Sequence, residues 1–425
     1  MTSAQLCSES LAVSDLEFSQ LRERALALGT VIEHDDCSIS AFGRAEAIPL
    51  PNGLGDPARL AAVTVRLAEI ARRAPGGGRS SDRDPSGLPL ALGALPFRPD
   101  RPGTLVVPEV VAISSKGAPR VVMVTARGEG RTTLDRLLGA RPAAQSAPPD
   151  SFRLESARPH EEYLERVALA VDEVRSGRLE KVVLAREVLI EANRAWRQGD
   201  LLEHLRSLHP SCTTFFVDGF LGATPELLVR RSGELFSSHP LAGTAARSGD
   251  PECDRRTDQL LLDSRKEQME HRAVVEAIAK SFAPVAESVL VPHTPSIVEL
   301  RNVSHLGTRI EGRLRPASRG PLPSVLELLS LIHPTPAVCG SPPDLALEYL
   351  DKSEDFDRDR YGGAVGWVRA DGDGEFHLGI RSAIVEGSHA RLFAGAGIVG
   401  DSDPATELAE TQLKLQAVLA AAVRP

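Results

Sequence analysis

The sequence has few cysteines, and none is spaced for a paired function. They are scattered along the chain without any Cys-x-x-Cys motif, at Cys7, Cys37, Cys212, Cys253 and Cys339. Neither a disulfide scaffold nor a zinc site is therefore indicated. This cysteine usage fits a reducing cytosol.

Long apolar runs and a surplus of positive charge are also absent. No uncharged stretch is long enough to span a bilayer, and the start of the chain has neither the cationic residues nor the apolar run of a leader. The net charge is −9, without a dense Lys/Arg stripe, which argues against a nucleic-acid or anionic-membrane surface. We expect a soluble cytoplasmic protein whose partners are small molecules.

The 425 residues can form one large domain or two smaller ones. Two segments read as surface loop or linker: 74–87, rich in Gly, Arg, Ser and Asp, and 141–151, rich in Pro and Ala. An amphipathic helix with Leu164, Val167 and Val171 on one face follows the second segment. The sequence thus predicts a variable part over 1–150 and a second region over 151–425.

Strands and helices alternate beyond residue 150. We expect strands over 181–191, 213–221 and near 296–306, a hairpin over 226–238, and helices through 201–208, over about 254–280 and before the His333-Pro334 turn. The β-rich stretch 364–399 contains short DGDG and EGSH turns, which indicate antiparallel hairpins. The predicted fold class is mixed α and β (α+β), with large antiparallel sheets.

Two pairs of carboxylates carry the strongest chemical signal. Glu267 and Glu270 lie in SRKEQMEH, and Glu407 and Glu410 lie in PATELAETQLK, each pair spaced i, i+3. On a helix this spacing puts both side chains on one face. Two such helices facing each other would offer four oxygen ligands to one cation, most plausibly Mg²⁺. Taken alone, such pairs are more often solvated helix faces.

The glycines of residues 395–400 match the dinucleotide-binding pattern GxGxxG. Only about 25 residues follow them, too few for a helix, a second parallel strand and its acidic ribose ligand. Dinucleotide binding is therefore not expected. The glycines either let the backbone approach a ligand and offer N–H groups to an anion, or make a tight turn.

Several ordered motifs together resemble the chorismate-binding enzymes, nearly continuously from about residue 155 to the end. They are LEKVVLAREV, ATPELLVRR, SSHPLAGTAAR, the helix with MEH, HPTPAVCGSP, YGGAVGW, LGIRSA, FAGAGIVGDS and ELAETQLKL. The family includes isochorismate synthases, salicylate synthases, anthranilate synthase large subunits and aminodeoxychorismate synthases. The resemblance implies the fold of anthranilate synthase component I: antiparallel sheets packed together with outer helices, to which the N-terminal third also contributes. It further implies one cleft for chorismate and Mg²⁺.

The resemblance assigns roles to the four glutamates. Glu270 and Glu410 would be direct Mg²⁺ ligands, and Glu267 and Glu407 would act through water or by orienting the coordination sphere. The metal would hold the ring carboxylate of chorismate. This agrees with the helical spacing of the two pairs.

Further residues resemble the substrate contacts of the family. Arg381 in LGIRSA and Lys414 in QLKL are similar to its carboxylate-binding cations, and an arginine fork suits a carboxylate. Thr244 and backbone N–H groups around Gly397 are candidates for the same contact. His305 in VSHL resembles a substrate-contacting histidine. Read alone, Arg381 would be a strand-end charge and His305 a structural histidine.

Two residues carry the implied acid and base. Lys181 in LEKVVLAR resembles the general base of those members that add water to the ring, and it must be unprotonated to act. Glu226 in TPELL matches the acid that protonates the departing C4 hydroxyl, which requires a raised carboxyl pKa. The alternative for Lys181 is an ordinary solvated strand end.

Two further positions bear on the branch of the family. By resemblance, Ala242 in PLAGT occupies the position at which aminodeoxychorismate synthases carry a nucleophilic lysine. The alanine argues against that branch. Val338 in PTPAVCG is aliphatic, as in isochorismate synthases, whereas members that also eliminate pyruvate tend to carry a smaller polar residue such as Thr. The resemblance thus favours release of isochorismate.

The resulting hypothesis is an isochorismate synthase that isomerises chorismate with Mg²⁺ and feeds siderophore or menaquinone synthesis. We expect a monomer without an amidotransferase subunit. The alternatives are a salicylate synthase, an anthranilate synthase large subunit that needs an amidotransferase, and a non-catalytic chorismate or Mg²⁺ sensor.

Overall fold

The computed structural model describes residues 6–34, 37–73, 88–115, 120–125, 134–135, 138–139, 147–316 and 321–423. The predicted loop 74–87 and most of the predicted linker 141–151 lie outside these residues. No helix in the described ranges is both long enough and apolar enough to cross a membrane.

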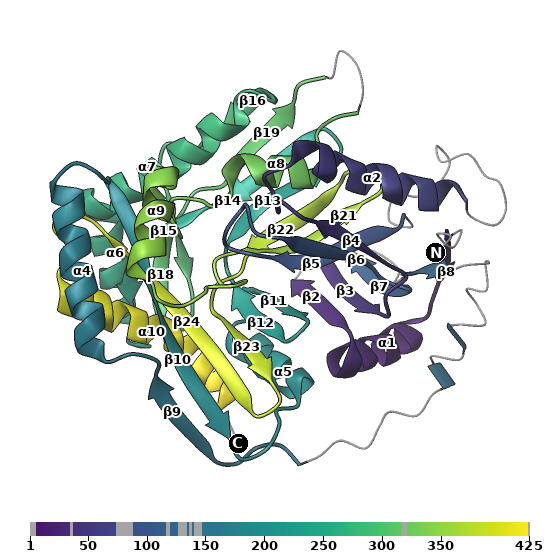
Figure 1. The fold of residues 1–425 in the computed structure, drawn as a ribbon, viewed down its shortest axis with the longest axis horizontal. Coiled ribbons are helices and arrows are strands. Elements are labelled where there is room, and N and C mark those ends of the chain that lie inside the picture. Colours follow the sequence, from purple (N-terminus) through teal and green to yellow (C-terminus); the bar gives the residue numbers. More distant parts are fainter. Residues whose placement is uncertain are drawn as a thin grey trace.

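A large antiparallel sheet runs through the molecule and contains strands from both ends of the chain (Figure 1). In spatial order its strands are β1 (Cys7–Ala12), β8 (Arg120–Thr125), β7 (Val110–Ser115), β3 (Cys37–Phe42), β2 (Thr30–His34), β11 (Thr213–Val217), β12 (Phe220–Thr224), β23 (Ser382–Glu386), β24 (His389–Ile398), β10 (Lys181–Ala192) and β20 (Gly340–Ser341), with β9 (Phe152–Ser156) paired to β10.

Two further antiparallel sheets complete the β-structure of the described residues. The larger contains, in spatial order, β16 (Ala286–Leu290), β19 (Ile310–Leu314), β14 (Leu235–His239), β13 (Leu227–Ser232), β22 (Gly374–Leu378), β21 (Ala364–Arg369), β5 (Leu90–Leu95), β6 (Gly103–Val107) and β4 (Glu46–Leu50). The smaller contains β15 (Leu241–Ala246), β18 (Val303–Gly307) and β17 (Ser296–Glu299). The predicted mixed fold with large antiparallel sheets is confirmed.

Strands from before and after residue 150 pair with each other in both large sheets. Phe215 of β11 lies opposite Ile32 of β2, and Gly366 of β21 lies opposite Gly93 of β5. The two parts of the chain therefore share their hydrogen-bonded sheets. The division into 1–150 and 151–425 stays a prediction.

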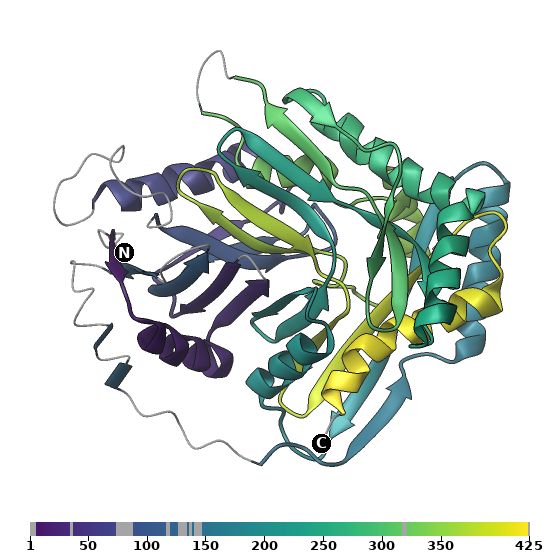
Figure 2. The ribbon, with the colours of Figure 1, turned by 180° about the vertical axis from the view of Figure 1, so that it is seen from behind.

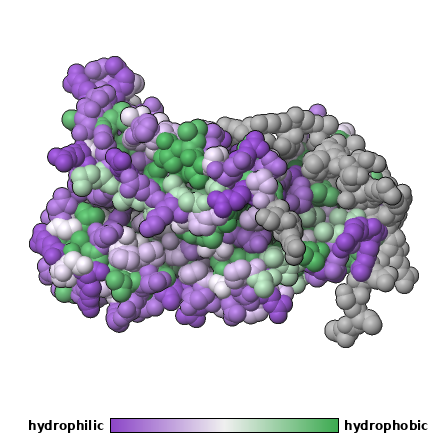
Figure 3. Space-filling view, turned by 90° about the horizontal axis from the view of Figure 1, so that it is seen from above, coloured by the Kyte–Doolittle hydropathy of each residue, from purple (hydrophilic) through white to green (hydrophobic). Residues whose placement is uncertain are grey.

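The helices pack on the outside of the sheets (Figures 1 and 2). They are α1 (Asp15–Leu28), α2 (Pro57–Arg72), α4 (His160–Arg175), α5 (Gln198–Leu208), α6 (Pro251–Asp263), α7 (Arg265–Phe282), α8 (Val325–Ile332), α9 (Pro343–Ser353) and α10 (Pro404–Ala422). In α2 the buried residues Leu60, Val63, Leu67 and Ile70 recur at helical spacing, so one apolar stripe faces the core. Hydrophilic side chains cover most of the coloured face in Figure 3.

The structure corrects three sequence predictions. The strand expected near 296–306 is the hairpin β17–β18. The single helix expected over about 254–280 is two helices, because Ser264 adopts an extended conformation (ψ 108°) and its side chain accepts a hydrogen bond from the Glu267 amide. The strand expected over 213–221 is the hairpin β11–β12, in which Asp218 (φ 49°) and Gly219 (φ 76°) make the turn.

Candidate active site

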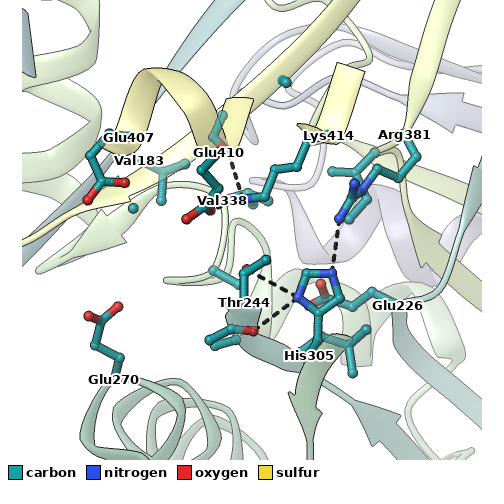
Figure 4. Close-up of a pocket in the computed structure, with 18 of the residues that line it drawn as sticks. Val183, Glu226, Thr244, Glu270, His305, Val338, Arg381, Glu407, Glu410 and Lys414 are labelled. Atoms are coloured by element: carbon teal, nitrogen blue, oxygen red, sulfur yellow. Dashed lines mark hydrogen bonds and ion pairs between the residues drawn. The ribbon is translucent and has the colours of Figure 1, made fainter. Parts of the chain in front are cut away.

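One pocket contains all twelve residues that the sequence assigned to a site (Figure 4). It has a volume of about 240 Å³ and lies between helices α7 and α10 and strands β10, β15, β18 and β24. The twelve lining residues are Lys181, Glu226, Thr244, Glu267, Glu270, His305, Val338, Arg381, Gly397, Glu407, Glu410 and Lys414.

The two carboxylate pairs come from the first two turns of α7 and α10. Each helix begins at a side-chain cap that fixes its first turn: Ser264 for α7 and Asp403, followed by Pro404, for α10. In Figure 4, Glu407 and Glu410 lie on one side of the pocket and Glu270 on the other. The i, i+3 spacing predicted this placement on one face of each helix.

Burial and mutual repulsion disfavour the charged forms of the carboxylates in this cluster. Burial raises the pKa of Glu407 to about 7, and the Glu410 charge adds to the shift. Burial, with the Glu270 charge, also raises the pKa of Glu267. In Glu410 burial acts in the same direction, but the ion pair with Lys414 outweighs it and lowers the pKa. A divalent cation would relieve this repulsion, so the donor set fits Mg²⁺.

Each of two lysines contacts one glutamate: Lys414 contacts a glutamate of α10, and Lys181 contacts a glutamate of α7. Lys414 Nζ lies 2.5 Å from Glu410 Oε1, and Lys181 Nζ lies 3.4 Å from Glu270 Oε2. The four glutamates do not form a closed cage, since the one group of three donor atoms found within 4.8 Å of one another in the described residues lies elsewhere. An open set of carboxylates suits Mg²⁺, which usually keeps several waters.

Arg381 is held in an unusual backbone conformation at the opposite end of the pocket. It lies between β22 and β23 with φ 50°, a left-handed conformation that is costly outside glycine. Its Nη2 donates to His305 Nε2 at 2.9 Å, whereas its buried Nη1 has no hydrogen-bond partner among the described residues. A buried, unpaired guanidinium nitrogen in a pocket is a ready donor to an anion.

His305 acts as the support of that arginine in this structure. Its Nδ1 lies 3.0 Å from the Gly243 carbonyl and 3.2 Å from Thr244 Oγ1, and its Nε2 accepts from Arg381. Burial, with the charges of Arg381 and Lys414, lowers the pKa of His305 to about 3. The neutral ring therefore has protein partners at both nitrogens.

Lys181 opens strand β10 and reaches the pocket across Gly397 of β24. A Cβ atom at Gly397 would lie 2.5 Å from Lys181 Cε, so a larger residue there would push the end of the lysine side chain out of its present position. Both Gly395 and Gly397 belong to a regular strand and line the pocket. The alternative of a tight turn at these two glycines is wrong.

Glu226 lies between β12 and β13 and is 3% exposed. Burial raises the pKa of its carboxyl group to about 8, although a hydrogen bond from the Leu241 backbone and the charges of Lys181 and Lys414 act in the opposite direction. Its Oε1 has no hydrogen-bond partner among the described residues. A carboxyl group that keeps its proton at neutral pH can donate it to a bound substrate.

Four further residues line the pocket, and two of them were not singled out from the sequence. Val338 and Ala242 are buried and uncharged. Burial raises the pKa of the Tyr361 hydroxyl to about 12. Lys266 Nζ lies 3.6 Å from Asp401 Oδ1. Tyr361 and Lys266 stand inside the motifs YGGAVGW and SRKEQMEH, so their positions could have suggested the site.

Carboxylates on two helices, lysines near them and a buried arginine opposite give the pocket groups suited to a divalent cation and to a small anion. The family model described as Chorismate binding enzyme matches residues 104–423. The chain belongs to this family, which confirms the resemblance found in its motifs.

The relatives identified by sequence include isochorismate synthases. The chain is 34% identical over 392 residues to isochorismate synthase DhbC of Bacillus subtilis, with 90% of each chain covered. It is 36% identical over 336 residues to isochorismate synthase EntC of Escherichia coli, covering 78% of this chain and 80% of that protein. It is 43% identical over 273 residues to the salicylate biosynthesis isochorismate synthase of Pseudomonas aeruginosa, but it spans only 55% of that longer protein.

Solved structures share the fold. DhbC of Bacillus anthracis superposes with a TM-score of 0.79 at 31% identity, over 95% of this chain and 99% of that one. Anthranilate synthase component I of Streptococcus pneumoniae superposes with a TM-score of 0.73 at 22% identity, over 90% of this chain and 92% of that one. The predicted resemblance to the component I fold is therefore confirmed.

Proposed function

We propose that this protein is an isochorismate synthase, which adds water at C2 of chorismate and removes the C4 hydroxyl with the help of Mg²⁺. The observation that carries the proposal is the meeting of Lys181 with a protonated Glu226 in one pocket. The names of the relatives at 34–36% identity support the same activity.

The pocket supplies groups for the carboxylates of chorismate. Arg381 offers its unpaired Nη1, and Lys414 stands on the wall of α10. Glu270 and Glu410 would hold Mg²⁺, with Glu267 and Glu407 orienting the waters around it. When bound, Mg²⁺ would neutralise a substrate carboxylate and fix its position.

The reaction needs one base and one acid on opposite sides of the ring. Lys181, unprotonated, takes a proton from water as the water oxygen bonds to C2. The ring double bond shifts, and the C4 hydroxyl leaves as water with the proton of Glu226. One water enters and one departs. Because Lys181 Nζ lies 3.4 Å from Glu270 Oε2, the lysine must give up its ammonium proton to solvent before it can act as the base.

The branch of the family depends on the residues beside the acid and base. The family resemblance links Lys181 to water as nucleophile, whereas Ala242 offers no amine that could attack the ring. Val338 presents only methyl groups and a 7% exposed surface, which favours release of isochorismate over further elimination. The product would supply siderophore or menaquinone synthesis, and the single chain would act without an amidotransferase subunit.

The test is to incubate the purified protein with chorismate and Mg²⁺, without ammonia or any second protein, and to separate the products by chromatography. Isochorismate without pyruvate is the expected result. Salicylate with an equivalent of pyruvate would contradict the proposal in favour of a salicylate synthase. Unchanged chorismate would contradict it in favour of a partner-dependent enzyme or a sensor.

A further inference from the structure

A second group of potential metal ligands lies outside the chorismate pocket. His34 ends β2 in one large sheet, and Glu375 and His377 lie on β22 in the other. The i, i+2 spacing puts Glu375 and His377 on one face of their strand. The three side chains meet between the two sheets, whose strands β2 and β22 are labelled in Figure 1.

The distances among the three side chains are close to those of a coordination site. His34 Nε2 lies 2.8 Å and His377 Nε2 lies 3.7 Å from Glu375 Oε1, and the three donor atoms all lie within 4.8 Å of one another. A tetrahedral ion with metal–ligand bonds of about 2.1 Å needs its donors about 3.4 Å apart. Small side-chain rotations therefore suffice to bring the three donors around one ion.

One member of the group points to a missing partner. His377 is 4% exposed, and its Nε2 has no hydrogen-bond partner among the described residues. A buried imidazole nitrogen that faces a carboxylate oxygen is well placed to be a metal ligand.

Arg230 holds the carboxylate of Glu375 from the far side. Its Nε donates to Glu375 Oε2 at 2.7 Å, which leaves Oε1 facing the histidines. Its Nη2 lies 3.3 Å from His34 Nε2, and its side chain is 32% exposed, so this longer Nη2 contact can open when an ion binds. The remaining Nε bond would keep the ligand oriented, as outer partners do in metal sites.

A cavity of about 230 Å³ opens beside the group and is lined by His34 and His377. It leaves room for water as a fourth ligand. Pro225 lines both this cavity and the chorismate pocket, so the two sites are neighbours.

We propose that His34, Glu375 and His377 bind one divalent transition-metal ion of the Zn²⁺ type, which ties β2 to β22. Two imidazoles and one carboxylate favour such an ion over Mg²⁺, whose preferred ligands are oxygens. The sequence did not reveal this site, because 341 residues separate His34 from Glu375. The inference does not depend on the reaction catalysed in the chorismate pocket.

The experiment uses the full chain after removal of metals with a chelator, with excess Mg²⁺ present throughout to occupy the glutamate pocket. Co²⁺ is titrated and followed by its visible absorption, and Zn²⁺ is titrated by calorimetry. We expect one ion per chain and a rise of Tm on addition of Zn²⁺. His377→Ala and His34→Ala should each weaken binding by about 100-fold or more.

His239→Ala is the matched control, because His239 lines the same cavity without belonging to the three ligands. It should bind Zn²⁺ as the unmodified chain does. If His377→Ala fails to fold, the partly exposed His34→Ala decides the question alone. No saturable binding of Co²⁺ or Zn²⁺ to the unmodified chain would overturn the proposal, as would unchanged affinity in His34→Ala.

Discussion

Glu226 and Glu410 are glutamates in the same pocket, yet their surroundings drive them to opposite protonation states. Among the described residues Glu226 has no cation within hydrogen-bond distance, and burial raises its pKa to about 8. Glu410 pairs with Lys414 at 2.5 Å and has a lowered pKa. One end of the pocket thus keeps a proton for the substrate, and the other keeps negative charge for a metal. The contrast shows how one residue type serves two chemical roles.

Replacing the proposed base should have the largest effect. Lys181→Ala removes the group that accepts the proton from water, and Lys181→Arg keeps the charge beside Glu270 but cannot accept a proton at neutral pH. Both variants should lose about 1,000- to 10,000-fold in kcat while chorismate still binds, as measured by steady-state kinetics and calorimetry. Lys352→Ala, on the exposed face of α9, is the control. Near-normal turnover in Lys181→Arg would show that only the charge is needed.

Replacing the proposed acid, Glu226, should lower the activity. Glu226→Gln keeps the shape but cannot donate the carboxyl proton, so we expect a loss of about 100- to 1,000-fold in kcat. The unmodified enzyme should lose activity as the pH rises above 8, where Glu226 ionises.

The same variant should be less active than the unmodified protein but more stable at alkaline pH. A pKa raised from 4.5 to about 8 gives a stabilising contribution that is present below pH 4.5 and is lost as the pH rises to 8. At about pH 9 the buried charge destabilises the unmodified protein, so Glu226→Gln should be more stable there by a few kcal/mol, of the order that such a shift implies. Thermal melts at acid and alkaline pH measure this difference. Equal melting temperatures at alkaline pH would argue against a buried, ionising Glu226.

The metal end of the pocket should respond to the Mg²⁺ concentration. Glu410→Gln removes a proposed ligand and should weaken Mg²⁺ by about 10- to 100-fold, with a parallel loss of activity. A Mg²⁺ titration of the rate measures this shift. Glu276→Gln, on the exposed face of α7 where Glu276 pairs with Arg272, should leave the titration unchanged. The same Mg²⁺ dependence in both variants would remove Glu410 from the metal site.

The smallest effect is expected at Val338. Val338→Thr replaces a methyl group by a hydroxyl of similar size, so kcat should change by less than about tenfold. The sensitive readout is pyruvate, which should become detectable in the variant and stay absent with the unmodified enzyme. Val338→Ile is the aliphatic control. Pyruvate from the unmodified enzyme would contradict the role assigned to Val338.

Much of the fold and of the pocket could be predicted from the sequence because local patterns encode it. The i, i+3 spacing placed Glu267 and Glu270 on one face of α7, and short DGDG and EGSH turns predicted the hairpins β21–β22 and β23–β24. The family motifs supplied the remaining candidates. These patterns involve residues close together in the sequence, so they can be recognised without knowledge of the tertiary structure.

Features that depend on single dihedral angles or on distant contacts could not be predicted. The break at Ser264 rests on one extended residue, and the positive φ of Arg381 has no local signature. The bond from Arg381 to His305 spans 76 residues. Burial of Glu226, which sets its pKa, depends on how the sheets pack around it.

The most direct test of the central claim follows the oxygen atom. The purified enzyme is incubated with chorismate and Mg²⁺ in water enriched in ¹⁸O, and the isochorismate formed is analysed by mass spectrometry. If Lys181 activates a water that adds at C2 while Glu226 expels the C4 hydroxyl, each product molecule carries one oxygen from the solvent. Product without the label would contradict this account, because the C4 hydroxyl itself would then have moved to C2.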